Sequence, residues 1–192
     1  MRIIFWCEFP SKVDLNKLNK ILVNLDLNIE VYLASRNLKE FKNLKEMFSR
    51  IKHIKAIGCW PILDKSKGYW YSGFTDEEAL NSLLEFKGLK LKIDIEPPLE
   101  NKSFSYLGLK KWILKYCLFK RARNKDLLSK ILKQLKNENL IISTFPFPCF
   151  MIKNLINFSD LRNSNLNLMY YSSLIPKIFK PFYRIKFKGI VN

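Results

Sequence analysis

The segment from 89 to 98, LKLKIDIEPP, constrains the fold of this chain more than any other. Leucine or isoleucine occupies every odd position from 89 to 95, and lysine or an acidic residue occupies every even position from 90 to 96. This period of two predicts a β-strand with one apolar face. Pro97 and Pro98 end the strand directly after Glu96. Asp94 and Glu96 are therefore expected on one face, at the carboxyl end of the strand.

Two interpretations of this acidic pair are open. The carboxyl ends of parallel strands are where α/β folds place their chemistry, which favours a functional site. The alternative is a half-exposed strand whose polar face meets water, a pattern that is commoner in antiparallel sheets. The elements expected in the rest of the chain favour the first interpretation.

Strand and helix patterns alternate along the whole chain. Five further strands are expected at 2–9, 29–35, 53–60, 140–145 and 166–172. Helical patterns lie at 14–25, 38–51, 79–86, 106–137 and 150–158, and the fourth divides near Asn124 into two helices. This alternation with short connections predicts a parallel sheet built of right-handed βαβ units.

The length and composition predict one domain spanning residues 1–192. A chain of 192 residues that is 48% hydrophobic can bury a core of its own. A (β/α)8 TIM barrel takes about 250 residues, and this chain supplies six strand patterns. We therefore expect an α/β fold of the (β/α)8 TIM-barrel type, truncated to about six βα units, with the last two units missing.

The chain is strongly basic. It has 34 Lys and Arg against 17 Asp and Glu, a formal charge of +17. Such an excess indicates weak binding to a polyanion or to an anionic membrane surface, for which the basic segments 110–125 and 177–188 are the candidates. The alternative for the first segment is the solvated face of a helix. No run approaches the roughly 18 apolar residues that a membrane span requires.

Several classes of site are not indicated. The four cysteines form no CxxC pair, which argues against a zinc site or a disulfide framework, and reduced thiols favour a cytoplasmic location. His53 is the only histidine, so a multi-histidine metal centre and a Ser-His-Asp hydrolase are not expected. No phosphate-binding glycine motif follows a strand, so we expect no nucleotide cofactor. The absence of a CxxC pair and the single histidine lead us to expect no metal either. Glu8 and Pro10 interrupt the apolar N-terminal segment before it reaches signal-peptide length.

An aromatic loop follows the third expected strand. Its candidate ligand-binding residues are Trp60, Tyr69, Trp70 and Tyr71. Exposed aromatic rings offer flat apolar faces on which sugar rings stack, and loops after parallel strands carry ligands in barrels. The first strand adds Trp6 and Glu8 at the same end. The alternative is that these rings are core residues of a loop that closes the barrel mouth.

Three strand ends together resemble the chitinase-type glycoside hydrolases of family 18. These barrels carry an SxGGW-like segment on strand three, DxxDxDxE on strand four and MxYD on strand six. This chain has IGCW at 57–60, DIE at 94–96 and MYY at 169–171, in the same order and at corresponding strand ends. The resemblance covers residues 2–172 and implies a glycan substrate bound at the barrel mouth.

The resemblance also implies roles for three residues. Glu96 would protonate the leaving oxygen of a glycosidic bond, Asp94 would orient an acetamido group of the substrate, and Tyr171 would donate a hydrogen bond to that group. The sequence departs from the family pattern at Leu89 and Lys92, which replace the first two aspartates of strand four. Ser172 replaces the aspartate of strand six.

Lys92 leaves the chemistry open. It is expected to face the same interior as Asp94 and could pair with it as a structural ion pair. Such a cation would lower the pKa values of the neighbouring carboxyls, which is the opposite of what a general acid needs. A glycoside hydrolase is therefore one hypothesis. A catalytically inactive or truncated barrel that binds carbohydrate, and a basic protein at a polyanionic surface, are the alternatives. A second copy of the chain would cover the edges of an open barrel.

Overall fold

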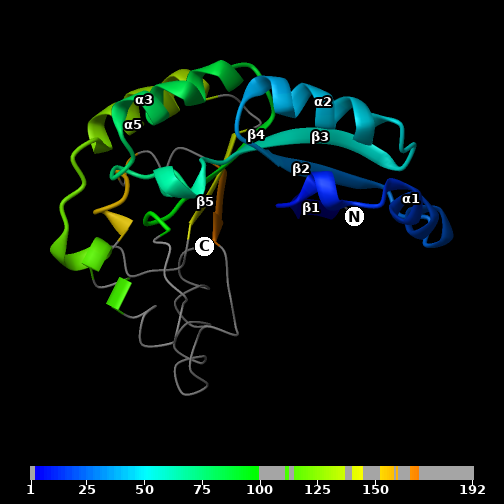
Figure 1. Cartoon of the computed structure of the whole chain (residues 1–192), viewed down its shortest axis with the longest axis horizontal. Helices are drawn as coiled ribbons and strands as arrows, with labels where there is room; N and C mark the ends of the chain where they lie inside the picture. Colours follow the sequence, from blue (N-terminus) through cyan, green and yellow to red (C-terminus); the bar gives the residue numbers. More distant parts are fainter. Residues whose placement is uncertain are drawn as a thin grey trace.

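The computed structural model describes residues 3–99, 111–112, 115–136, 140–144, 152–157, 159 and 165–168. These residues contain one parallel sheet with the strand order β1-β2-β3-β4-β5-β6. Its strands are β1 (Ile3–Cys7), β2 (Ile29–Ser35), β3 (Ile54–Pro61), β4 (Leu91–Ile95), β5 (Leu140–Thr144) and β6 (Asn165–Leu168). Figure 1 shows that the sheet is curved, with α2, α3 and α5 along one side of it.

The prediction of a (β/α)8 TIM-barrel-like fold truncated to about six βα units is wrong. The sheet is an open half-barrel and not part of an eight-unit barrel. A closed barrel needs a tilt and a register stagger that bring its first and last strands together. Within the described residues, β1 pairs with β2 alone and β6 with β5 alone, so the sheet has two ends. The α/β class and the parallel sheet are confirmed.

The helices begin where polar side chains cap them. They are α1 (Leu15–Asn24), α2 (Leu38–Ser49), α3 (Glu77–Ser82) and α5 (Lys125–Leu135). Asp14, Asn37 and Asp76 each accept a hydrogen bond from the backbone N–H three residues later, which satisfies one of the free donors of a first turn. Short 3-10 turns occupy Pro10–Lys12, Lys65–Lys67 and Leu83–Phe86, and a π-helical turn occupies Lys115–Phe119. None of the described helices is long and apolar enough to cross a membrane.

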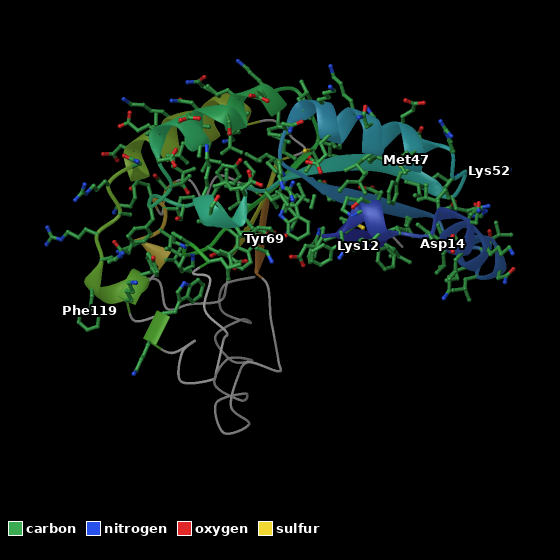
Figure 2. All side chains as sticks on the ribbon, in the orientation of Figure 1. Lys12, Asp14, Met47, Lys52, Tyr69 and Phe119 are labelled. Carbon is green, nitrogen blue, oxygen red and sulfur yellow. The ribbon has the colours of Figure 1, made fainter. Side chains whose placement is uncertain are left out.

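The two faces of the sheet carry different clusters of side chains. Toward the helices, the odd-numbered side chains of β4 are buried in an apolar core with residues such as Leu80, Leu83, Phe86, Leu128 and Ile131. The opposite, concave face carries a second cluster of Tyr32, Ala34, Trp60, Ile62 and Tyr69. Tyr69 can be followed in Figure 2 on the side of the sheet away from α3. Because side chains alternate along a strand, the even-numbered residues of β4 face this concave side.

Gly58 makes room for an aromatic ring on the concave face. A Cβ atom at this position would lie 2.4 Å from Cε1 of Tyr32, closer than a carbon can approach. Tyr32 is paired with Gly58 across β2 and β3 and is fully buried. The glycine therefore allows the Tyr32 ring to lie across β3.

The aromatic loop after β3 is built into the sheet. β3 and β4 pair at a single position, Cys59 with Leu91. Beyond it, Tyr69 accepts a backbone hydrogen bond from Leu63, and Tyr71 forms a parallel bridge with Ile95. The loop thus occupies the space between the carboxyl ends of β3 and β4.

Candidate functional site

The candidate site begins with three charged residues of β4 and its carboxyl end. Lys92, Asp94 and Glu96 are 1%, 2% and 2% exposed, although each carries an ionisable group. They occupy alternate positions and share the concave face. Neighbours on both sides bury them, because β4 lies between β3 and β5 in the sheet. The alternative of a half-exposed strand does not fit these exposures.

Lys92 is held by a carboxylate and two indole rings. Its Nζ atom donates to Oδ1 of Asp94 over 2.5 Å. The same atom lies 3.8 Å from the ring centroid of Trp60 and 4.8 Å from that of Trp6. Burial lowers the pKa of Lys92, and the adjoining Asp94 carboxylate opposes this shift. The ion pair expected from the sequence is therefore present.

Asp94 is shielded from solvent as well as paired. Burial raises the pKa of Asp94, and the Lys92 ammonium acts in the opposite direction. The Ser143 hydroxyl and the Trp60 indole approach the same carboxylate and also lower its pKa. Neither Oγ of Ser143 nor Nε1 of Trp60 has the distance and angle of a hydrogen bond to a described group. Ser143 is the direct neighbour of Asp94 across β4 and β5.

Glu96 is the third buried ionisable group of this strand end. Burial raises the pKa of Glu96 well above its usual value, and the charge of Asp94 adds to this effect. Lys92 opposes the shift and Glu8 supports it. Oε2 of Glu96 is buried without a hydrogen-bond partner among the described residues. A carboxyl in such surroundings holds its proton and can act as a hydrogen-bond or proton donor.

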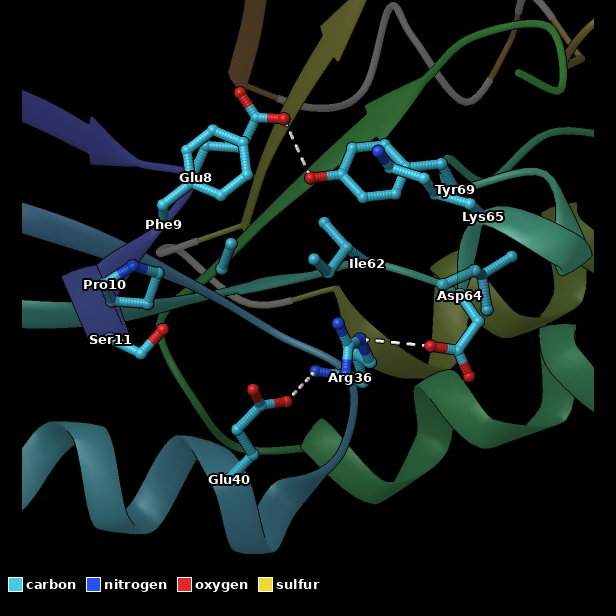
Figure 3. A pocket seen from close by; sticks show the side chains of 12 residues that line it. Glu8, Phe9, Pro10, Ser11, Arg36, Glu40, Ile62, Asp64, Lys65 and Tyr69 are labelled. Carbon is cyan, nitrogen blue, oxygen red and sulfur yellow. Dashed lines mark hydrogen bonds and ion pairs between the residues drawn. The ribbon is translucent and has the colours of Figure 1, made fainter. Parts of the chain in front are cut away.

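Glu8 and Tyr69 join the first strand to the aromatic loop. The Tyr69 hydroxyl donates to Oε1 of Glu8 over 2.8 Å, as Figure 3 shows. Tyr69 has a left-handed backbone, with φ of 66°, and follows Gly68, with φ of 99°. A left-handed conformation is costly for a residue with a ring at Cβ and is found most often where function requires it.

A cavity of about 320 Å³ lies against this pair. Ala34, Ile62 and Leu63 give it apolar walls, and Phe9 and Pro10 line it from the end of β1. Its polar lining residues are Glu8, Ser11, Arg36, Glu40, Asp64, Lys65 and Tyr69. Nε of Arg36 lies 3.1 Å from Oδ1 of Asp64. The cavity therefore reaches Glu8 and Tyr69, whereas Lys92, Asp94 and Glu96 are not among its lining residues.

The structure brings together most of the residues expected at the site. Lys92 is contacted by Trp6, Trp60 and Asp94, and Trp6 is 43% exposed. Glu96 follows at the end of the same strand and is buried. Tyr71 lies apart from them, because it is buried in the core between the sheet and the helices. Trp70 packs against Tyr69 with edge-to-face rings 5.2 Å apart. Tyr171 lies outside the described residues.

Sequence reasoning missed Ser143 and the polar lining of the cavity. Ser143 is a polar residue that follows two isoleucines near the carboxyl end of β5, and this was the available signal. Arg36 directly follows β2, and Asp64 follows β3 after two apolar residues. Polar residues just beyond parallel strands were the signal for this part of the site. Within the described ranges, no group of three or more His, Cys, Asp and Glu side chains is placed to hold a metal ion.

Comparisons of this chain with protein-family models, with curated proteins and with solved structures give no match.

Proposed function

We propose that the protein binds a glycan at the concave mouth of the half-barrel and hydrolyses a glycosidic bond, with Glu96 as the proton donor. The observation that carries this proposal is the buried Glu96 carboxyl, whose Oε2 has no described hydrogen-bond partner. Burial and the neighbouring Asp94 raise the pKa of this carboxyl, as general acid catalysis at neutral pH requires.

Aromatic side chains support a carbohydrate as the substrate. Trp6 is exposed on the concave side, and its ring lies over the Lys92 ammonium. Tyr69 and Trp70 pack edge to face at the end of β3. Tyr69 is buried, whereas Trp6 is exposed and Trp70 is half-buried. Rings with one face accessible provide stacking surfaces for sugars, with the polar edge left to donate hydrogen bonds.

The substitution Glu96→Gln tests the proposal. It keeps the shape of the side chain and removes the transferable proton. We therefore expect the rate of hydrolysis of an oligosaccharide that the unmodified protein cleaves to fall by about 100-fold or more. Binding of the same oligosaccharide should be retained. The exposed Glu85 provides the matched control, Glu85→Gln, which should leave turnover unchanged. Unchanged turnover in Glu96→Gln would contradict the assignment of Glu96.

A second candidate is a carbohydrate-binding protein without hydrolytic activity. The Lys92–Asp94 ion pair favours it, because a carboxylate already held at 2.5 Å by a buried ammonium is not free to orient a substrate. Measurable glycan affinity without turnover in the unmodified protein would select this candidate.

The remaining expectations rest on the sequence. Residues 177–188, which we expect to bind a polyanion or membrane surface, lie outside the described residues. Most of the segment 110–125 is described, and Lys111, Lys120, Arg121 and Arg123 are exposed there. Steep weakening of binding by salt is the test. We also propose a cytoplasmic location, in keeping with the free thiols of Cys7 and Cys59.

A further inference from the structure

We propose that the outer edge of β1 pairs with β1 of a second copy of this chain, antiparallel and centred on Phe5. The sheets of the two copies then continue into each other across a twofold axis. The pairing uses none of the residues proposed for hydrolysis, so the two proposals stand or fall separately.

β1 is an edge strand without the features that usually protect such edges. Among the described residues it pairs with β2 alone, so its other side faces no strand there. Its five residues, Ile3–Cys7, include neither a charged residue nor a proline, and its register with β2 runs without a bulge. An uncharged, regular edge of this kind is a template on which a further strand pairs.

Large apolar side chains are exposed on both faces of this edge. Ile3 and Cys7 face the helices, where they pack against the clusters beneath α1 and α2. Phe5 lies between them on the same face and is 49% exposed. Trp6, on the concave face, is 43% exposed. A partner strand and its side chains would cover part of both rings.

The sequence of β1 favours a second copy of the same chain as the partner. Residues directly opposite each other in an antiparallel pair share a face, so a twofold pairing places one residue opposite its own copy. Centred on Phe5, the pairing also places Ile4 opposite Trp6 and Ile3 opposite Cys7. Aromatic pairs and pairs of an aromatic with a β-branched residue are favourable across strands.

The charges that flank the apolar stretch agree with this register. Arg2, which precedes the described residues, and Glu8 are each three positions from Phe5. The proposed pairing brings position 2 of each copy opposite position 8 of the other, so an opposite-charge pair closes each end. The Tyr69 hydroxyl donates to Oε1 of Glu8, and Figure 3 shows the other oxygen directed away from Tyr69. Centring on Trp6 would instead place Glu8 opposite an isoleucine.

Molar mass and a cross-link test the pairing on the full-length protein. Size-exclusion chromatography with light scattering should give twice the 22.8 kDa mass of the chain. On oxidation, Ile3→Cys should form a disulfide with Cys7 of the other copy, because opposite Cα atoms in antiparallel strands lie about 4.5–5.5 Å apart. Ile3→Cys with Cys7→Ser is the control and should give no cross-linked dimer.

Phe5→Lys should separate the two copies. It places like charges opposite each other at the twofold axis, so we expect the dissociation constant to rise at least about tenfold. Phe119→Lys, at a phenylalanine that is 79% exposed and lies outside β1, is the matched control and should remain dimeric.

A charge exchange tests the register. Glu8→Arg places two arginines opposite each other and should weaken the dimer, and adding Arg2→Glu should restore it. The hydrogen bond from Tyr69 to the Glu8 carboxylate is lost in both variants, so it cannot account for the recovery.

A monomeric mass of the unmodified protein would overturn the proposal. A dimer that Phe5→Lys leaves intact, or one that cross-links equally in the Cys7→Ser control, would overturn it too, because another surface would then join the copies. Circular dichroism verifies the fold of Phe5→Lys. The cross-link leaves Phe5 unchanged and decides the question if that variant does not fold.

Discussion

Lys92 and Asp94, two residues apart on β4, form an ion pair that is almost completely buried, with 2.5 Å between Nζ and Oδ1. The indole ring of Trp60 lies against the same ammonium, 3.8 Å from its nitrogen. A charge pair in such a position replaces the apolar residues that usually fill the centre of a parallel sheet. It also sets the electrostatic environment of Glu96.

Asp94→Asn should destabilise the protein strongly. The substitution leaves the Lys92 ammonium buried without a counter-ion, for which we expect a loss of about 3–5 kcal/mol in the free energy of unfolding. Urea unfolding measures the loss. Asp64→Asn is the control, because its partner Arg36 is 59% exposed and such pairs contribute about 0–1 kcal/mol. Equal effects of the two substitutions would show that the buried pair contributes no more than the surface pair.

Glu96 should make stability depend on pH. Burial raises the pKa of the folded-state carboxyl well above 4.5, so the folded form keeps a proton that the unfolded form has lost. The contribution of Glu96 is therefore fully present below its unfolded pKa and is lost as pH rises through the folded pKa. Unfolding curves recorded from pH 4 upward should show the unmodified protein losing stability relative to Glu96→Gln. A difference that stays constant with pH would contradict the raised pKa.

Gly58→Ala should overpack the concave face. The new methyl group would lie 2.4 Å from Cε1 of Tyr32, and overpacking of this kind costs about 1–3 kcal/mol. The double variant Gly58→Ala with Tyr32→Leu lacks the obstructing ring, so it should recover part of the lost stability. Thermal or urea unfolding of the two single variants and the double variant gives the coupling free energy between positions 32 and 58. Simple additivity would mean that Tyr32 is not the obstacle.

Asp76→Ala should weaken the start of α3. The Asp76 side chain accepts the Ala79 N–H at 2.7 Å, and loss of such a cap costs about 0.5–2 kcal/mol. Glu77→Ala, in the same first turn, removes a carboxylate without removing the cap. We expect the Asp76 variant to be the less stable of the two in urea unfolding, and the reverse order would refute the capping role.

Local patterns predicted the strands well, because alternation of residue types along a strand reflects which face of the sheet each side chain occupies. The period of two placed β4 and the shared face of Asp94 and Glu96, and the expected break near Asn124 coincides with the start of α5. Closure of the sheet was not predictable in this way. It depends on tilt and stagger accumulated over all strands, and no single segment encodes them.

The orientation of the side chains in the aromatic loop could not be predicted from the sequence either. Tyr69 and Tyr71 are two residues apart, and an extended chain would place them on one face. The left-handed backbone at Gly68 and Tyr69 interrupts this alternation, so Tyr69 joins the concave cluster while Tyr71 enters the core beneath the helices. The cavity was missed for a related reason, since its lining comes from the ends of three strands.

The insertion of the aromatic loop between β3 and β4 bears on how this protein can be redesigned. The backbone N–H of Tyr71 donates to the carbonyl oxygen of Asp94, and the carbonyl oxygen of Tyr71 accepts the backbone N–H of Glu96. Exchanging the loop for another sequence would thus remove ladder bonds from the residues that carry the proposed chemistry. New specificity is better sought by changing side chains that line the cavity, with the path of the main chain from 62 to 75 left as it is.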